Sequence, residues 1–152
     1  MKPLRLNKEI LILFFLCLIC VPALAESSQR TIALVTANDS NISELASIEI
    51  RKLFLGVPAM HGKKQLRPLR NSTDKLLTEI FLQKVIFMSE RNYEKQLLSR
   101  VYRLGGTRPE IYTNKSELVN KIQNTPGALT YMWAEEVADL KTLRVIWSVN
   151  VD

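Results

Sequence analysis

The sequence has few of the residues on which most enzyme sites and disulfide-stabilised domains depend. It contains two cysteines, one histidine, five glycines and six prolines among 152 residues. Two cysteines cannot form a disulfide framework or a four-thiolate zinc site, and one histidine leaves little for metal or nucleophilic catalysis. The apolar share of 47% and the charged share of 24% exclude a disordered or collagen-like chain. The composition is that of one ordinary globular domain.

Short motifs of known catalytic or nucleotide sites are absent as well. The sequence has no nucleophile elbow, zinc-binding histidine pair, P-loop or dinucleotide fingerprint. Glu135 and Glu136 are adjacent, so on a helix they point in different directions and do not form a facing acid–base pair. His61 is a lone loop histidine, a poor basis for a metal or catalytic site. We therefore expect no catalysis, no cofactor and no bound metal.

The N-terminus carries the pattern of a secretory signal peptide. Lys2, Arg5 and Lys8 precede an apolar run at 10–21, and the small residues at 23 and 25 suit signal peptidase. The run is well short of the ~20 residues that a helix needs to cross a bilayer. We therefore predict a cleaved signal, a periplasmic domain and no membrane span after cleavage. The alternatives are an uncleaved anchor or a buried N-terminal helix.

Under this interpretation residues 1–25 are the signal peptide and residues 26–152 the mature domain. Cys17 and Cys20 lie in the signal, so the domain has no disulfide, and Ile19 before Cys20 disfavours a lipid anchor. Cleavage removes three basic residues and one acidic residue, which lowers the net charge from +6 to +4. A mildly basic exported domain argues against a nucleic-acid partner and suits a small anion, lipopolysaccharide or an acidic protein face.

Strand and helix patterns alternate along residues 26–152, and no repeat, low-complexity segment or linker divides them. Apolar and β-branched runs predict strands at 31–37, 65–70, 128–133 and 143–147. Helical spacing and capping residues predict helices at 48–55, from 71–74 to Met88, at 90–104 and 114–123, with a short helical segment at 134–139. This alternation predicts an α/β sandwich with a mostly parallel or mixed sheet of about four strands flanked by helices.

Capping residues and apolar stripes refine the predicted helices. Ser47 is the expected N-cap of the first helix and Gly56 its end. The two central helices carry apolar stripes that we expect to pack on one sheet, Leu77, Phe81, Val85 and Met88 in one and Tyr93, Leu97, Val101 and Leu104 in the other. Asn114 and Glu117 have the spacing of a capping box.

Several short motifs follow one another between residues 32 and 147 in the order found in one family of binding proteins. They are Phe54-Leu55-Gly56, Gly62-Lys63-Lys64, Leu66-Arg67-Pro68-Leu69, Phe81, Gly105 with Pro109, and Pro126-Gly127-Ala128-Leu129-Thr130-Tyr131. In this order they are similar to the Phe-x-Gly helix ending, the Asn-Gly-Lys turn and its strand, the usual Phe, the Phe-x-Gly-x-x-x-Pro segment and the Pro-Gly-Ala-Ile-Gly-Tyr segment of that family. The chain thus resembles the periplasmic phosphate-binding-protein-like family of the type 2 solute-binding superfamily.

The resemblance implies a fold and a site, with two departures. Full-length members have two lobes that close on ligand, at about twice this length, so the chain looks like a single periplasmic-binding-protein-like lobe. The family holds phosphate on a helix N-terminus built from a Ser-Gly-Thr or Gly-Ser turn shortly after an arginine. A gapless alignment on Phe81 puts Asp74-Lys75 at Gly-Ser, and only a shifted alignment makes Asn71-Ser72-Thr73 the counterpart of the turn.

Arg70, Ser72 and Thr73 are the candidate ligand-binding residues. Backbone N–H groups at a helix start carry partial positive charge, hydroxyls donate hydrogen bonds, and an arginine grips two phosphate oxygens. The alternative is that these residues only cap a helix, and Asp74 in the first turn would repel an anion. Lys63, Lys64 and Arg67 add basic charge nearby, either to the site or to a solvated edge.

Two functions follow from these observations. The first is an exported, non-catalytic, solute-binding-like domain that binds phosphate or another small anion for an ABC transporter or an envelope sensor. The second is a ligand-free accessory protein that contacts a membrane sensor or transporter. The poor match at Asp74-Lys75 favours the second, and fold resemblance does not decide between them.

Overall fold

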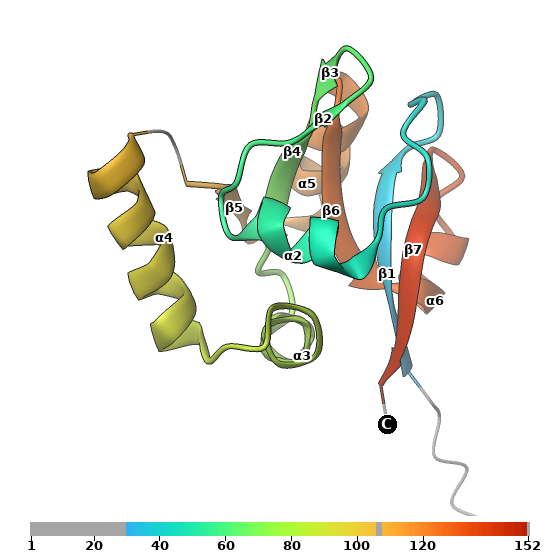
Figure 1. The fold of residues 1–152 in the computed structure, drawn as a ribbon. Helices are drawn as coiled ribbons and strands as arrows, with labels where there is room; N and C mark the ends of the chain where they lie inside the picture. The colour runs from blue at the N-terminus through green and yellow to red at the C-terminus, as the bar shows by residue number, and fades with distance from the viewer. Residues whose placement is uncertain (1–29, 106–107, 152) are drawn as a thin grey trace, which may run out of the picture.

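The computed structural model describes residues 30–105 and 108–151, as one sheet with helices on both faces (Figure 1). The predicted signal peptide lies outside the described residues. The strands are β1 (Arg30–Ala37), β2 (Met60–His61), β3 (Lys64–Gln65), β4 (Arg67–Asn71), β5 (Glu110–Tyr112), β6 (Ala128–Trp133) and β7 (Leu143–Val151). The helices are α2 (Ser47–Phe54), α3 (Lys75–Phe81), the π-helical turn η2 (Leu82–Ile86), α4 (Glu90–Leu104), α5 (Lys115–Asn124) and α6 (Ala134–Ala138).

The main sheet is mixed and has five strands in the order β5-β4-β6-β1-β7. Strand β4 pairs in parallel with β5 and β6, whereas β1 pairs antiparallel with both β6 and β7. The predicted α/β class and mixed sheet are confirmed. The fifth strand, β5, was not predicted because its three residues are too few to show a period. The separate hairpin of β2 and β3, which overlaps the predicted strand 65–70 only at Gln65, was not predicted either.

The alternation of side chains along the central strands divides the core into two halves. In β1, Ile32 and Leu34 face the cluster that includes residues of α2 and α3, whereas Ala33 and Val35 face the cluster with Leu118 of α5. All six residues of β6 are buried. A central strand that is covered on both faces therefore appears in the sequence as a continuous apolar run, which is why 31–37 and 128–133 were correctly predicted.

The first two helices begin and end through local hydrogen bonds. The N-cap of α2 is Ala46, one residue before the predicted Ser47, and the Glu49 carboxylate accepts a hydrogen bond from its N–H at 2.8 Å. Helix α3 begins after Asp74 and continues into η2, which ends at Phe87 with φ 59°. The apolar spacing did not predict this π-helical turn, because Phe81 and Val85 are buried four residues apart, a spacing that an α-helix gives as well.

Helix α4 stands apart from the sheet (Figure 1). It begins at Glu90 as predicted, but only Tyr93 and Leu97 of its apolar stripe are buried, and Leu104 is 70% exposed. The expectation that this whole stripe packs on the sheet is therefore wrong for its C-terminal half. Among the described residues no helix combines the length and the apolar character that a membrane span requires.

Gly127 closes the turn that leads into β6 and fixes its position beside the β3–β4 connection. Its φ is +81°, and a Cβ atom there would overlap the carbonyl oxygen of Gln65. The Gly127 carbonyl in turn accepts a hydrogen bond from the Arg67 N–H at 2.8 Å. Glycine is required here by both the left-handed backbone and the close approach of a neighbouring segment.

We predict that Gly127→Ala lowers the free energy of unfolding by about 2 kcal/mol or more, because strain at positive φ adds to a backbone clash. Gly62→Ala is the matched control. Its φ is +60° but nothing lies within 4 Å of the added Cβ, so about 1 kcal/mol is expected. Urea unfolding measures both, and equal losses in the two variants would contradict the clash.

Candidate functional site: the carboxyl edge of the sheet and its arginine cluster

The carboxyl ends of the three parallel strands meet at one edge of the sheet. After β4 the chain enters α3, whose Leu77 and Phe81 pack on one face, whereas after β6 it enters α6, whose Val137 packs on the other. The chain therefore leaves neighbouring strands toward opposite faces. In α/β sheets a crevice at such a switch point is the usual ligand position.

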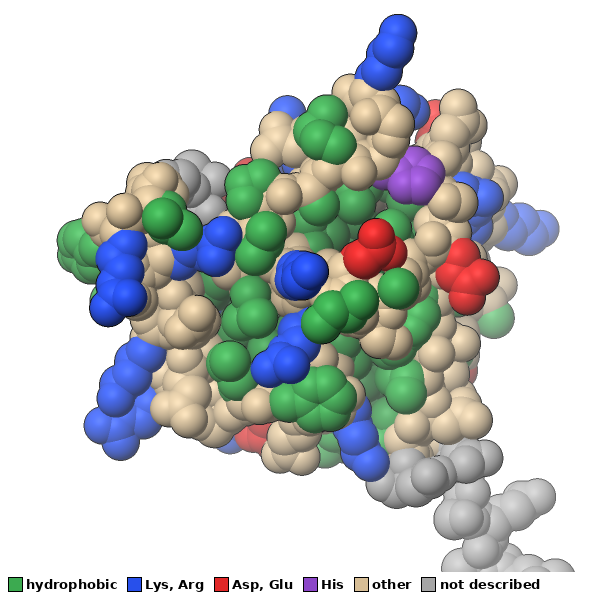
Figure 2. Space-filling model, viewed as in Figure 1, with side chains coloured by type: hydrophobic (Ala, Val, Ile, Leu, Met, Phe, Trp, Pro, Cys, Tyr) green, Lys and Arg blue, Asp and Glu red, His purple; other side chains and the backbone are tan. Residues whose placement is uncertain are grey.

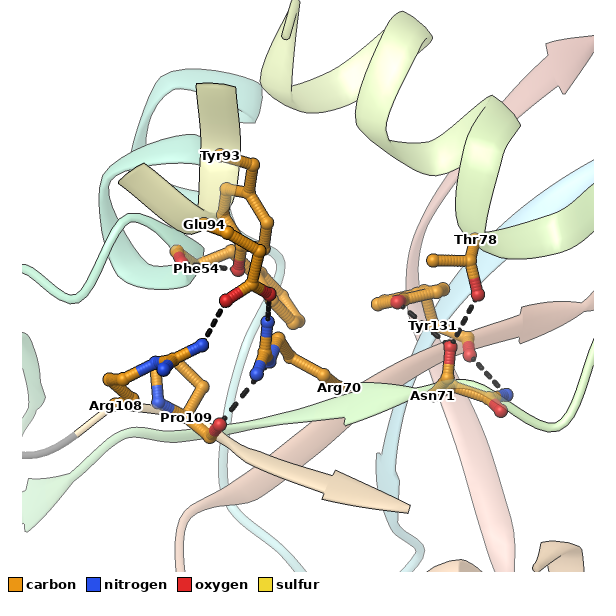
Figure 3. Close-up of polar contacts among 9 residues, drawn as sticks. All are labelled: Phe54, Arg70, Asn71, Thr78, Tyr93, Glu94, Arg108, Pro109 and Tyr131. Carbon is orange, nitrogen blue, oxygen red and sulfur yellow. Dashed lines mark hydrogen bonds and ion pairs between the residues drawn. The ribbon is translucent and has the colours of Figure 1, made fainter. Parts of the chain in front are cut away.

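Asn71, the last residue of β4, organises this edge. Its side-chain amide donates to the Tyr131 carbonyl at 2.9 Å, and its side-chain oxygen accepts from the Thr73 N–H at 3.0 Å and the Thr73 hydroxyl at 2.7 Å. Its backbone carbonyl accepts from the Tyr131 and Thr78 hydroxyls, both at 2.9 Å (Figure 3). The Thr73 hydroxyl, one of the predicted ligand groups, is thus already bound inside the chain.

Asp74 occupies the N-terminus of α3. Its carboxylate accepts hydrogen bonds from the N–H groups of Leu76 at 2.8 Å and Leu77 at 3.3 Å, and from the Trp133 indole at 2.8 Å. The Trp133 bond is the main cause that lowers the pKa of Asp74, with the two N–H donors adding to it. An ionised carboxylate therefore sits at the helix end where a phosphate would need the same donors.

Ser72 lies between these two residues and is exposed. Its N–H donates to the Tyr112 carbonyl at 2.8 Å, which ties the end of β4 to the end of β5. Lys75, the other residue of the gapless alignment, points into solvent and pairs with Glu79 at 3.7 Å. Of the three predicted ligand residues, Ser72 is the one whose side chain faces solvent at the edge.

Arg70 is turned toward α4 and is 7% exposed (Figure 3). Its guanidinium forms an ion pair with Glu94, donates through Nε to the Pro109 carbonyl at 3.3 Å, and lies 5.7 Å from the ring centre of Tyr93. The second carboxylate oxygen of Glu94 pairs with Arg108. We call Arg70, Glu94 and Arg108 the arginine cluster. Its two cations share one carboxylate.

Tyr93 and Tyr131 are neutral supports of these contacts. The Tyr93 hydroxyl donates to the Phe54 carbonyl at 2.7 Å and so links α4 to α2. Burial raises the pKa of both tyrosines, so both hydroxyls act as hydrogen-bond donors at neutral pH. Tyr131 also stacks on Phe81, with ring centres 3.7 Å apart. These two residues therefore hold the site in place through hydrogen bonds and ring packing.

His61, Glu135 and Glu136, which the sequence analysis considered and rejected as catalytic candidates, each make local contacts. His61 is in the β2–β3 hairpin, where its Nε2 lies 3.2 Å from the N–H and the hydroxyl of Ser43. Glu135 and Glu136 pair with different cations, Arg30 at 3.9 Å and Lys115 at 3.4 Å. In the ranges 30–105 and 108–151 there is no cluster of three or more metal-ligating side chains.

Sequence reasoning missed Glu94 and Asn71. Glu94 belongs to a polar stretch, and its place next to the buried Tyr93 on α4 was the one signal that it faces inward. Asn71 was considered as part of a capping segment and, in the shifted alignment, of the family's turn, but not as a buried hydrogen-bonding residue. Its fully buried side chain was not recognisable, because its main partner, Tyr131, is 60 residues away in sequence.

We predict that Asp74→Ala lowers the free energy of unfolding at pH 7 by about 1 to 2 kcal/mol, because the helix cap and the partner of Trp133 are lost. The folded-state pKa of Asp74 is below its unfolded value, so its contribution is complete above the unfolded pKa and disappears as the pH falls through the folded pKa. The deficit against wild type should therefore shrink below about pH 4. Asp139→Ala, at an exposed carboxylate, is the control. A deficit that stays constant on acidification would contradict this account.

We further predict strong coupling between Arg70 and Glu94. Glu94→Gln leaves a buried guanidinium without its charge partner, whereas Arg70→Leu with Glu94→Gln removes the unpaired charge. A double-mutant cycle in urea should give a coupling free energy of about 1 to 3 kcal/mol. The same cycle for the exposed pair Lys75 and Glu79 should give no more than about 0.5 kcal/mol. Similar couplings in both cycles would contradict a structural role for the buried pair.

Comparisons with known proteins bear on the fold. No protein-family model matches the chain, and no curated protein matches it in sequence. Among solved structures, the chain is similar to an ABC-type phosphate transport receptor from Vibrio cholerae, with a TM-score of 0.55 and 10% identity. It is also similar to PstS from Borrelia burgdorferi, with a TM-score of 0.50 and 12% identity. Each match covers 77% of this chain, but only 45% and 46% of those chains.

This chain therefore spans less than half the length of the proteins that it resembles in structure. At 10% and 12% identity the likeness concerns the fold. A mixed five-stranded sheet with helices on both faces matches a single periplasmic-binding-protein-like lobe, as the sequence motifs implied.

Proposed function

We propose that this chain is a non-catalytic, solute-binding-protein-like lobe of the cell envelope that acts by contacting a membrane sensor or transporter. In this proposal it does not hold an anion by itself. The observation that carries the proposal is the ion pair between Arg70 and Glu94. Arg70 is the strongest anion-binding group among the predicted ligand residues, and its charge and its Nε donor are both used within the chain.

The remaining groups of the edge support the same conclusion. The Thr73 hydroxyl is bound by Asn71, and the first N–H groups of α3 are bound by the carboxylate of Asp74. An incoming phosphate would have to displace these bonds and approach an ionised carboxylate. The cost of both steps opposes binding at neutral pH.

The lobe that the structure describes offers an anion one wall. A closing two-lobe protein removes its ligand from water, which strengthens each charged contact because the effective dielectric constant falls. On one lobe the anion remains hydrated and the same contacts are weaker. A partner protein that covers the exposed edge would supply what is missing. Placement in the envelope rests on the leader pattern of residues 1–25.

The second candidate is a lobe that binds phosphate or another small anion through Arg70, Ser72 and Thr73. One observation favours it: Glu94 is shared by the guanidinium groups of Arg70 and Arg108, so the arginine cluster keeps a net positive charge. If Glu94 moved away, both cations would be free to grip phosphate oxygens. In this candidate Glu94 is the group that the anion displaces.

Calorimetric titration of residues 26–152 with phosphate, and with sulfate as a second anion, distinguishes the leading proposal from the second candidate. We predict no saturable binding to wild type or to Glu90→Gln, a control on the exposed side of the same helix. Saturable binding to wild type that Arg70→Ala and Ser72→Ala abolish would overturn the leading proposal. Binding that appears only in Glu94→Gln would favour the second candidate with Glu94 as its internal competitor.

A further inference from the structure

A groove separates α4 from the body of the domain, away from the carboxyl edge described above. Its volume is about 790 Å³, within the range of ligand and peptide sites in proteins. One wall is α4, and the other is formed by α2, the β3–β4 connection and the segment around Pro109. It exists because α4 stands off the sheet, held by the contacts of Tyr93 and Glu94 near its start.

The floor of this groove is apolar. Leu53 and Leu66 from the body and Leu97 from α4 are buried in it, and Val57 and Val101 are half-buried. Farther along α4, Leu104 lines the groove with 70% of its surface exposed. In the first half of α4 the apolar stripe is buried against the rest of the domain, whereas at Leu104, in the second half, it is exposed to solvent. Open apolar surface of this kind favours a partner that covers it.

The rim of the groove is basic. Arg67, Arg100, Arg108 and Lys121 line it, against one carboxylate, Glu110. Lys121 pairs with Glu110 at 3.2 Å and Arg108 with Glu94. Within the described residues neither Arg67 nor Arg100 has a carboxylate within ion-pair distance. Figure 2 shows basic side chains over α4 and also spread over the rest of this face. Low-dielectric walls strengthen the field of such cations inside a groove.

Arg100 is fixed at this rim. Its Nε donates to the Gly56 carbonyl at 3.0 Å, so the guanidinium bridges α4 to the end of α2 while its charge stays without an acidic partner. A held cation loses less side-chain freedom when it binds a carboxylate than a free one does. Arg67, on β4, is exposed on the opposite wall. Arg100 and Arg67 therefore line the groove from opposite walls.

We propose that this groove binds an acidic peptide segment of a partner protein, with aliphatic side chains on the apolar floor and Asp or Glu at the basic rim. The proposal rests on the proposed function and names the surface that makes the contact. A phosphate ion has no apolar part to cover Leu104 and Val101. A flat membrane surface would contact the rim but would not enter the groove between α4 and the body, where Val57 and Val101 are half-buried. A peptide satisfies both the floor and the rim, as in helix-in-groove recognition.

The test is selection from a random peptide display library on the immobilised domain. Wild type should enrich peptides in which acidic residues flank aliphatic ones. Two groove variants, Arg67→Glu and Leu104→Asn, should weaken a selected peptide by about tenfold or more. The controls Arg91→Glu and Leu98→Asn change α4 outside the groove and should bind like wild type. Arg67→Gln replaces the charge reversal if Arg67→Glu fails to fold.

Several outcomes would overturn the groove proposal. These are an absence of enrichment, enriched peptides without acidic residues, and affinity that the groove variants leave unchanged. Co-sedimentation with phosphatidylglycerol vesicles that Arg67→Glu abolishes, in the absence of peptide enrichment, would reassign the surface to lipid. Saturable phosphate binding that Arg70→Ala abolishes would overturn the leading function and leave the peptide result standing, so the two failures are distinguishable.

Discussion

The buried guanidinium of Arg70 needs a carboxylate, and the way Glu94 supplies it determines the rest of this site. A cation that is 7% exposed cannot remain unpaired without a large cost in desolvation. Glu94 meets that need from α4, so the pair anchors the helix by its first turns and leaves its later turns away from the sheet. The same pair occupies the charge of Arg70, the cation that the sequence offered as an anion-binding candidate.

At the carboxyl edge, polar groups that could bind a ligand are hydrogen-bonded within the chain. Thr73 donates to the side chain of Asn71, and the carboxylate of Asp74 accepts from the first turn of α3 and from the indole of Trp133. Each of these groups would be a donor or acceptor for a ligand in an open site. Here they stabilise the strand-to-helix turn, and the ionised Asp74 carboxylate takes the place of an external anion.

The open surface of the lobe lies at the groove beside α4. The fold of the described residues resembles one lobe of larger binding proteins. The similarity covers 45% and 46% of those two chains. In the proposed function, a protein partner covers the exposed surfaces of this lobe. In the groove, the open stripe at Leu104 and the cations Arg67 and Arg100 are the groups that the proposed acidic peptide would contact.

Strands and helix caps, which depend on residues close together in the sequence, could be predicted from the sequence. The runs at 31–37 and 128–133 became β1 and β6, and Asn114 caps α5 as its spacing with Glu117 indicated. These predictions succeeded because side-chain period and capping act over a few residues. The α/β class followed from the order of such elements, and the single lobe from the resemblance.

The tertiary structure decided the state of the candidate site. The sequence offered Arg70 as an anion-binding candidate, but its partner Glu94 is 24 residues away, and no local pattern indicates which carboxylate a buried arginine will meet. The position of α4, the short strand β5 and the groove depend in the same way on contacts between distant segments. Such contacts are selected by packing and burial over the whole fold, so only the folded chain shows them.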